Sequence, residues 1–282
     1  MDKQEQRRSG ALRRASPAKD IPRSVGSRLA AMREAGPAVH LISPTATLPF
    51  QTDALAAAGG KPMTILTREE VTEVTALTAA LSLSIGALRP ELLDTMLWAV
   101  ETARGQGNPW VFDVAEAGAS SFRRQPMAAL IGRRPAVIAS PPADIMTLAG
   151  LGRELGAEDT LLAAARAIAT RFEAVVAVLA DEPVLTDGTR ALLIHGGHPV
   201  TDRVPGIAAA RPTLIAAFLA SGLSTGEGAM EAATAALALD AAAGFEAGRR
   251  SAGPGSVAMH YLDRLALLSP AELDDVTRIT PL

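Results

Sequence analysis

The sequence contains no cysteine, and only 3% of its residues are aromatic. The absence of cysteine excludes disulfide bonds, thiolate zinc sites and a cysteine nucleophile. The shortage of aromatics means that the core must be built mainly from Ala, Val, Leu and Ile, which favours helices packed on a sheet. A chain of 282 residues is long enough to bury such a core as one domain.

Long apolar runs are also missing. No stretch reaches about 18 apolar residues without charges or helix breakers, so no membrane span is expected. The N-terminus carries charges where a secretory signal needs an apolar segment, so the protein is expected to be cytoplasmic. Residues 1–24 are interpreted as a flexible basic tail and residues 25–282 as a single domain. Contact of the tail with nucleic acid or lipid headgroups is the alternative, but we expect neither partner for a chain of net charge -3.

Short apolar runs alternate with helical segments along the first two thirds of the chain. The runs have strand length and are apolar on both faces: 38–43, 81–86, 110–115, 135–140 and 174–180. This pattern is typical of a parallel sheet covered by helices on both faces. It predicts an α/β fold, a three-layer α/β/α sandwich with a mainly parallel central sheet. Residues 185–197 predict a hairpin, and from about residue 206 the chain is expected to be mostly helical.

Familiar catalytic motifs are absent as well: there is no Walker A pattern, no G-x-G-x-x-G after a strand and no H-E-x-x-H. Candidate site residues can still be chosen by their position, because ligands of open parallel sheets bind at the carboxyl ends of the strands. Asp113 closes one predicted strand and Asp144 follows another. Two such carboxylates can hold a hydrated Mg²⁺ ion. The alternative is that both aspartates only cap loops or helices.

The histidines indicate a metal site less strongly than the two aspartates do. His195 and His198 lie close together in "HGGHP", but no third ligand of suitable spacing follows, so a positioned loop is favoured over a metal site. His40 and His260 lie in apolar or helical surroundings and are interpreted as structural.

Several segments, taken in order, resemble the hydroxyethylthiazole kinase family of the ribokinase-like fold, over about residues 25–278. The segments that carry the resemblance are "VHLISPTATLPFQTDALAAAGGKPMT", "LSLSIGAL", "WVFDVAEAGASSFRR", "LTDGTRALLIHGGHPVTDRVPG" and "GPGSVAMHYLDRL". The resemblance implies a homotrimer that transfers the γ-phosphoryl group of MgATP to 4-methyl-5-(2-hydroxyethyl)thiazole in thiamine salvage. It also implies thiazole sites at subunit interfaces and ATP sites at the carboxyl edge of the sheet.

At the positions that the family uses for nucleotide and catalysis, the chain departs from the pattern. Ala209 stands where the resemblance places a catalytic cysteine or acid. Ala139 replaces an arginine that contacts the nucleotide, and Leu179 replaces a threonine expected to meet phosphate. Asp113 and Asp144 keep the acidic groups assigned to the metal.

The thiazole side of the site departs in the same way. The resemblance assigns substrate contacts to Gly206, which is retained, and to the position of Leu48, where the family has methionine. Ser84 stands for the asparagine before Ile-Gly.

The start of the helix after Gly206 bears on phosphate binding. Pro212 is costly inside a helix and comfortable at its first position. We therefore expect this helix to begin near Arg211 or Pro212, about a turn late, with the amides of residues 207–209 used in loop geometry.

These departures predict a family homologue with impaired or no kinase activity, a ligand-binding protein or a partner subunit, in a homotrimer that is uniform or mixed with an active relative. The alternative is a functional diverged kinase that acts on the thiazole or a related small alcohol and uses Mg²⁺ and ATP. A third hypothesis is a purely structural or interaction role that depends on the basic tail.

Overall fold

The computed structural model describes residues 24–86, 88–151, 158–222 and 228–282. Its centre is a sheet whose strands, as far as these residues go, lie in the order β2-β1-β3-β4-β5-β6-β7-β8-β9. Their bounds are β1 (Ala38–Ile42), β2 (Lys61–Met63), β3 (Ala80–Ser84), β4 (Trp110–Asp113), β5 (Val137–Ser140), β6 (Val175–Val178), β7 (Val184–Thr186), β8 (Ala191–His195) and β9 (Arg278–Pro281).

The sheet is parallel from β2 to β6 and antiparallel from β6 to β9. Across the three central strands, Ser84 of β3 is in register with Asp113 of β4, and Asp113 is in register with Ala139 of β5. The carboxyl ends of these strands therefore meet at one edge of the sheet, as parallel pairing requires.

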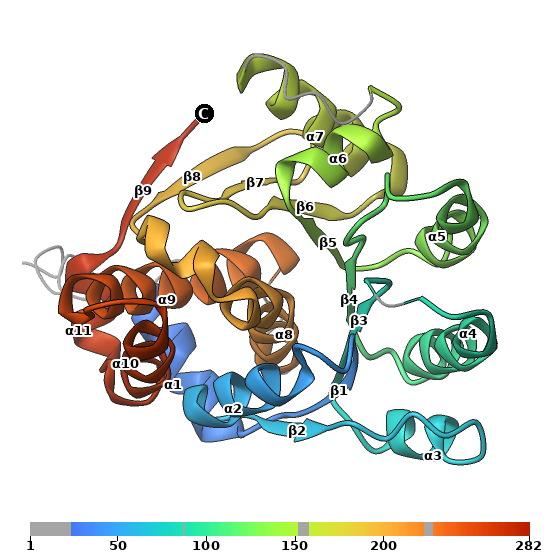
Figure 1. Cartoon of the computed structure of the whole chain (residues 1–282), viewed down its shortest axis with the longest axis horizontal. Coiled ribbons are helices and arrows are strands. Elements are labelled where there is room, and N and C mark those ends of the chain that lie inside the picture. The colour runs from blue at the N-terminus through green and yellow to red at the C-terminus, as the bar shows by residue number, and fades with distance from the viewer. Residues whose placement is uncertain (1–23, 87, 152–157, 223–227) are drawn as a thin grey trace, which may run out of the picture.

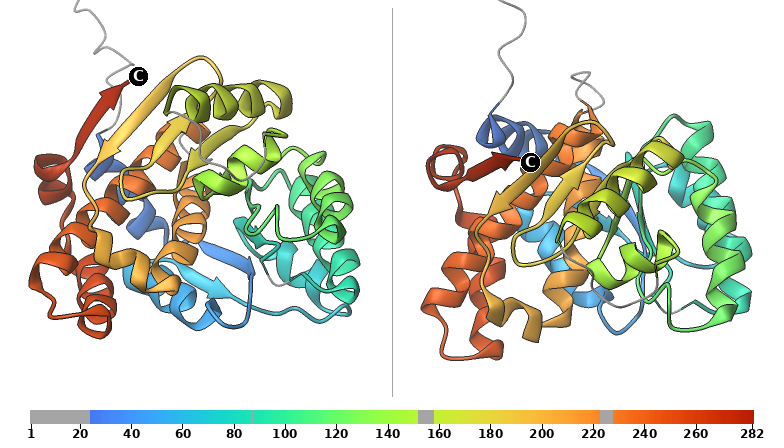
Figure 2. Two further views of the ribbon diagram at one scale, coloured as in Figure 1. Left: turned by 45° about the horizontal axis from the view of Figure 1, so that its top comes forward. Right: turned by 90° about the horizontal axis from the view of Figure 1, so that it is seen from above.

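Helices cover both faces of the sheet, and Figures 1 and 2 show the resulting three layers. The helices of one face are α3 (Val71–Ala76), α4 (Pro90–Gly105), α5 (Arg124–Ile131), α6 (Pro142–Leu148) and α7 (Glu158–Phe172). Those of the other face are α1 (Val25–Ala35), α2 (Leu48–Ala58), α8 (Pro205–Gly222), α9 (Ala229–Arg250), α10 (Pro254–Leu267) and α11 (Pro270–Val276). Two short 3₁₀ turns, η1 (Ser121–Arg123) and η2 (Pro199–Arg203), precede α5 and α8.

Each interface between sheet and helices has its own apolar cluster. On the α8 side the cluster is rich in alanine, because α8 and α9 lie against each other with small side chains between them. On the other side, Trp110 and Phe112 of β4 are buried against α4 and α5. The strands are buried on both faces, which explains why their sequences are apolar throughout.

The predicted fold class, the five predicted strands and the hairpin are confirmed. The hairpin joins β7 to β8 through the four residues 187–190, in which Gly188 has a positive φ of 95°. The helical last third was incomplete as a prediction, because β9 returns to the sheet and pairs with β8. Of the predicted tail, residues 1–23 lie outside the described residues, and Ser24 caps α1 by accepting a hydrogen bond from the amide of Ser27.

The prediction of a late start for the helix after Gly206 is wrong. Helix α8 begins at Pro205 and contains Pro212 in its interior. A proline inside a helix costs about 3 kcal/mol, but nearly all of α8 is buried between the sheet, α2 and α9. Packing therefore outweighs the local preference, and Pro205, at the first helical position, is well placed to start the helix.

None of the helices among the described residues is both long enough and apolar enough to cross a membrane.

Candidate active site

A cleft of about 1050 Å³ lies at the carboxyl edge of the parallel strands. The residues that line it come from the ends of β3 and β4, from the segments after β1, β3, β4, β5 and β6, from η2 and from the beginning of α8: Ser43, Pro44, Ala46, Thr47, Ser84, Gly86, Asp113, Ala115, Glu116, Pro141, Pro142, Leu179, Ala180, Asp181, Glu182, Asp202, Pro205, Ala208, Ala209 and Arg211. This is the edge at which open parallel sheets bind ligands.

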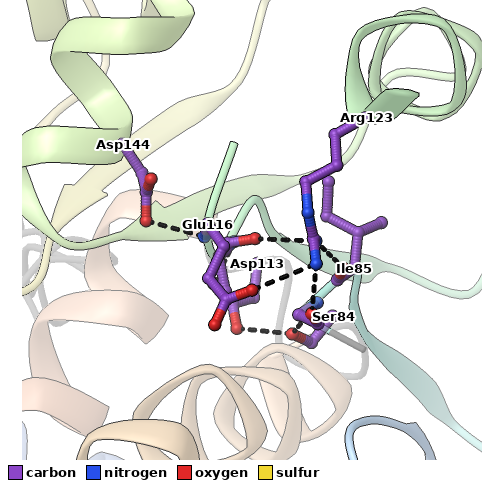
Figure 3. A network of polar contacts seen from close by, with 8 residues as sticks. Ser84, Ile85, Asp113, Glu116, Arg123 and Asp144 are labelled. Atoms are coloured by element: carbon purple, nitrogen blue, oxygen red, sulfur yellow. Dashed lines mark hydrogen bonds and ion pairs between the residues drawn. The ribbon is translucent and has the colours of Figure 1, made fainter. Parts of the chain in front are cut away.

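Asp113 lies at the end of β4 and faces the cleft. Its Oδ2 accepts a hydrogen bond of 2.7 Å from Ser84 Oγ, and its Oδ1 accepts one of 3.0 Å from the amide of Ala115 (Figure 3). Burial raises the pKa of Asp113 from 3.8 to about 6, against the opposing effect of these hydrogen bonds, and the nearby charge of Asp144 contributes to the increase. A cation beside Asp113 would therefore stabilise its ionised form.

Asp144 lies in the first turn of α6 and is only 5% exposed. Its Oδ2 accepts a hydrogen bond of 2.9 Å from the amide of Glu116, whereas its buried Oδ1 has no hydrogen-bond partner among the described residues. Figure 3 shows the Asp144 carboxylate beside the Glu116 backbone, which in this view lies between Asp144 and Asp113. A buried carboxylate oxygen without a partner is costly unless a cation or water satisfies it.

These two aspartates fit Mg²⁺ in chemistry, since this ion prefers oxygen ligands, uses few carboxylates and keeps several waters. No larger group of His, Asp and Glu side chains suited to a metal occurs in the part of the chain that the structure describes. The structure brings together the pair that the sequence singled out, and the metal itself stays a prediction.

Arg123, at the end of η1, fixes the two loops beside Asp113. Its guanidinium donates to the backbone carbonyls of Ile85 and Gly86, the latter at 2.6 Å, and forms an ion pair of 3.0 Å with Glu116 (Figure 3). Glu116 itself has a positive φ of 59°, a backbone region that side chains other than glycine rarely adopt. The contacts of Arg123 and Asp144 with this residue hold that conformation in place.

Helix α8 points its N-terminus at the cleft, and Pro205, Ala208 and Ala209 all line the cleft wall. Within this first turn the Ile207 amide donates to the carbonyl of Val204 at 2.9 Å. The first amides of a helix lack partners inside the helix, and the helix dipole places partial positive charge there. The site therefore keeps the helix terminus that the sequence analysis expected to be displaced.

The other predicted site residues differ in their access to the cleft. Ala209 and Leu179 line it, and both present only hydrocarbon. Ala139 is fully buried in β5. Gly206 is buried in α8 against the ring of Phe50, where an added Cβ would lie 2.5 Å from Phe50 Cγ. Leu48, the first residue of α2, packs against the apolar cluster on the α8 side.

None of the four histidines is among the residues that line this cleft, although His195 contacts Glu182, which does. His40 is buried, with Nδ1 at 2.8 Å from Thr75 Oγ1 and Nε2 at 2.8 Å from the carbonyl of Ile65, as expected of a structural residue. His195 contacts Glu182 and Thr280, and His198 Nδ1 accepts from the amide of Val200. His260 contacts Ser251.

Two features of the cleft were missed by the sequence analysis. The first is Arg211, whose Nε donates to Asp240 Oδ2 at 2.9 Å, while the hydroxyl of Tyr261 donates to Asp240 Oδ1 at 2.7 Å. The second is Asp181, whose Oδ1 is buried without a partner among the described residues. The sequence signal for the first was a single charge in the apolar helix α8 and another in the alanine-rich middle of α9.

Comparisons with known proteins show the family and the fold. The model of the hydroxyethylthiazole kinase family matches residues 29–271. A hydroxyethylthiazole kinase from Rhizobium etli (strain CIAT 652) is 36% identical over 258 residues, covering 89% of this chain and 99% of the relative. The solved structure of a hydroxyethylthiazole kinase protein from Pyrococcus horikoshii OT3 has a TM-score of 0.84 at 27% identity, covering 92% of this chain and 98% of that one. A ribokinase-like superfamily protein from Enterococcus faecalis V583 shares the fold, with a TM-score of 0.60 at 11% identity, over 91% of this chain and 92% of that one.

Proposed function

Because the chain belongs to the hydroxyethylthiazole kinase family, we propose that its cleft binds MgATP and a thiazole-type alcohol but transfers the phosphoryl group far more slowly than a fully equipped kinase. The observation that carries this proposal is the methyl group of Ala209. It lines the cleft at the position where the family resemblance places an acid or a thiol.

Binding is supported by the groups that remain. The N-terminus of α8 faces the cleft and suits a phosphate group. Asp113 and Asp144 lie where they would hold Mg²⁺, which when bound neutralises phosphate charge. Ser84 and the Ala115 amide keep the Asp113 carboxylate in position, and Arg123 holds the loops around it.

Slow transfer follows from the groups that are absent. Phosphoryl transfer depends on positioning and on electrostatic stabilisation, with a residue that orients the attacking hydroxyl and accepts its proton. An alanine at position 209 can do neither, and Ala139 and Leu179 offer no hydrogen bond to a nucleotide. Loss of one positioned acid-base group lowers the rate by about 10²- to 10⁴-fold.

Restoring the missing side chain tests this proposal. The variants Ala209→Cys and Ala209→Asp are expected to raise the rate of transfer from MgATP to 4-methyl-5-(2-hydroxyethyl)thiazole by at least tenfold, with little change in nucleotide affinity. The matched control is Ala208→Cys, which adds the same thiol one residue earlier on the same cleft wall. Equal rates in the wild type and in both Ala209 variants would show that position 209 does not limit the reaction.

A second candidate, an active diverged kinase, is favoured by Asp181. This residue lines the cleft, and its Oδ1 is buried without a partner among the described residues. Burial and the neighbouring charge of Asp202 raise the pKa of Asp181. A carboxylate of raised pKa is a better proton acceptor near neutral pH, so Asp181 could take the proton of the substrate hydroxyl in place of residue 209.

The two candidates separate by the wild-type rate and by Asp181→Asn. The impaired protein should bind MgATP, turn over slowly and be indifferent to Asp181→Asn. The active kinase should turn over readily and lose about 10²- to 10⁴-fold in rate on this substitution. Glu182→Gln, a neighbouring carboxylate on the same cleft wall, is the matched control.

Family membership also supports a homotrimer, uniform or mixed with an active relative, as the assembly. Light scattering of the purified protein should then give a mass near three times the 29.1 kDa of one chain. A mass of one chain, at concentrations where the protein binds nucleotide, would remove this part of the proposal.

A further inference from the structure

Arg211 is the one positively charged side chain among the described residues that line the cleft. It lies on α8, three residues after Ala208 and two after Ala209, which both line the same wall. Side chains on a helix lean toward its N-terminus, so the Arg211 side chain extends back over the turn that faces the cleft. The other charged residues of the wall are acidic: Asp113, Glu116, Asp181, Glu182 and Asp202.

The guanidinium of Arg211 is held in place by Asp240 on the side away from the cleft. Its side chain and that of Asp240 are each only 4% exposed, and Nε lies 2.9 Å from Asp240 Oδ2. Tyr261 donates to the other oxygen of Asp240 at 2.7 Å. Asp240 is therefore fixed by two helices, and it fixes one edge of the guanidinium in turn.

The other edge of the guanidinium is not used in this way. Arginine carries five N–H donors, and the bond to Asp240 employs the one on Nε. The two terminal nitrogens of Arg211 make no hydrogen bond with any residue that the structure describes. Burial lowers the pKa of Arg211, but the charges of Asp240, Tyr261 and Asp202 outweigh that effect and raise it, so the cation is maintained.

A buried cation with free, planar donors at the wall of a cleft matches the oxygens of a phosphate group, which accept two parallel hydrogen bonds from arginine. It lies beside the N-terminus of α8, which also favours an anion. Together, the Arg211 guanidinium and the start of α8 supply positive charge to a wall whose other charged side chains are all carboxylates.

We infer that Arg211 binds the terminal phosphate of the nucleoside triphosphate, adding a side-chain cation to the amides at the start of α8. This inference rests on the proposed function, because it takes the cleft as the MgATP site. It assigns a phosphate-binding role to a residue whose ion pair with Asp240 would otherwise be only structural. Adenosine monophosphate, which lacks the terminal phosphate, should bind without the help of Arg211.

The test compares a non-hydrolysable ATP analogue with AMP by calorimetry, both in the presence of Mg²⁺. In the triple variant Arg211→Met, Asp240→Leu, Tyr261→Phe, all three buried polar groups are replaced together, because removing one partner alone would leave an uncompensated charge. The affinity for the ATP analogue should fall about 10- to 100-fold, the loss expected for hydrogen bonds between charged groups, with the AMP affinity unchanged. Tyr261→Phe alone retains the guanidinium and should bind the ATP analogue within about twofold of the wild type.

An unchanged ratio of the two affinities in the triple variant would overturn the role of Arg211 and leave the proposed function standing. Rapid turnover by the wild type, with the affinity ratio lost in the triple variant, would overturn slow transfer and leave the role of Arg211 standing. If the triple variant does not fold, the guanidinium ¹⁵N resonances of Arg211 in the wild type give the answer. Inorganic tripolyphosphate should shift these resonances, and a titration without any shift would refute the contact.

Discussion

Arg211 and Asp240 form an ion pair of 2.9 Å between the apolar helix α8 and the buried, alanine-rich middle of α9. Each charge depends on the other, since each side chain is only 4% exposed. Replacing Asp240 with Leu should therefore lower the free energy of unfolding by about 3–5 kcal/mol, because Arg211 keeps its charge and loses its partner. Tyr261→Phe removes only one hydrogen bond to Asp240 and should cost about 1–3 kcal/mol.

Urea unfolding followed by circular dichroism measures both variants. Similar small losses, below about 1 kcal/mol for each, would mean that the pair is solvated and would weaken its assignment as a rigid support for the cleft wall.

Asp113 predicts a pH dependence of stability. Its folded-state pKa of about 6 lies above the ordinary value of 3.8, so the folded protein holds this proton more tightly than the unfolded chain does. The resulting stabilisation is complete below pH 3.8 and is lost as the pH rises through about 6. Because a tenfold change in an equilibrium corresponds to about 1.4 kcal/mol, ionised Asp113 costs the folded state about 3 kcal/mol at pH 8.

Asp113→Asn removes this cost while keeping the shape of the side chain. With chelator present to exclude metal, the variant should gain stability over the wild type progressively between about pH 4 and pH 6 and keep that gain up to pH 8. Unfolding curves that stay parallel across this range would contradict the assignment of the raised pKa to Asp113.

Gly206 couples the start of α8 to α2 through Phe50. An added Cβ would lie 2.5 Å from Phe50 Cγ and 2.6 Å from Phe50 Cβ, and this Cβ cannot move without the backbone of α2. Gly206→Ala should therefore destabilise the protein by about 1–3 kcal/mol and weaken nucleotide binding by shifting the helix terminus.

Gly105→Ala is the matched control, because Gly105 lies at the end of α4 with nothing within 4 Å of an added Cβ. This change should leave stability the same or raise it by up to about 1 kcal/mol. If Gly206→Ala behaved like Gly105→Ala in thermal melts, the close packing on Phe50 would not be what fixes the start of α8.

Some parts of the molecule could be predicted from the sequence and others could not. Asp113 and Asp144 were predicted to lie together because each follows a buried strand, and parallel strands bring such positions to one edge. The start of α8 was not predictable from its prolines, since the cost of Pro212 is local and the burial that offsets it is contributed by other elements. A preference of about 3 kcal/mol decides an isolated helix and does not decide a packed one.

Arg211 and Asp240 illustrate a second limit. They are 29 residues apart on different helices, and no periodicity relates them. A single charge in an apolar helix predicts that some partner exists, but the partner is set by how α8 and α9 cross. Likewise, that Asp144 Oδ1 has no partner in the described part of the chain is visible only once the loop of Glu116 is placed beside it.

The rate of phosphoryl transfer in a single turnover tests the central claim most directly. The wild type, saturated with MgATP and 4-methyl-5-(2-hydroxyethyl)thiazole, is compared by rapid quench with the Rhizobium etli relative under the same conditions. We predict measurable nucleotide binding together with a transfer rate roughly 10²- to 10⁴-fold below that of the relative, as expected when the group that accepts the proton is missing. A rate within about tenfold of the relative would contradict the account.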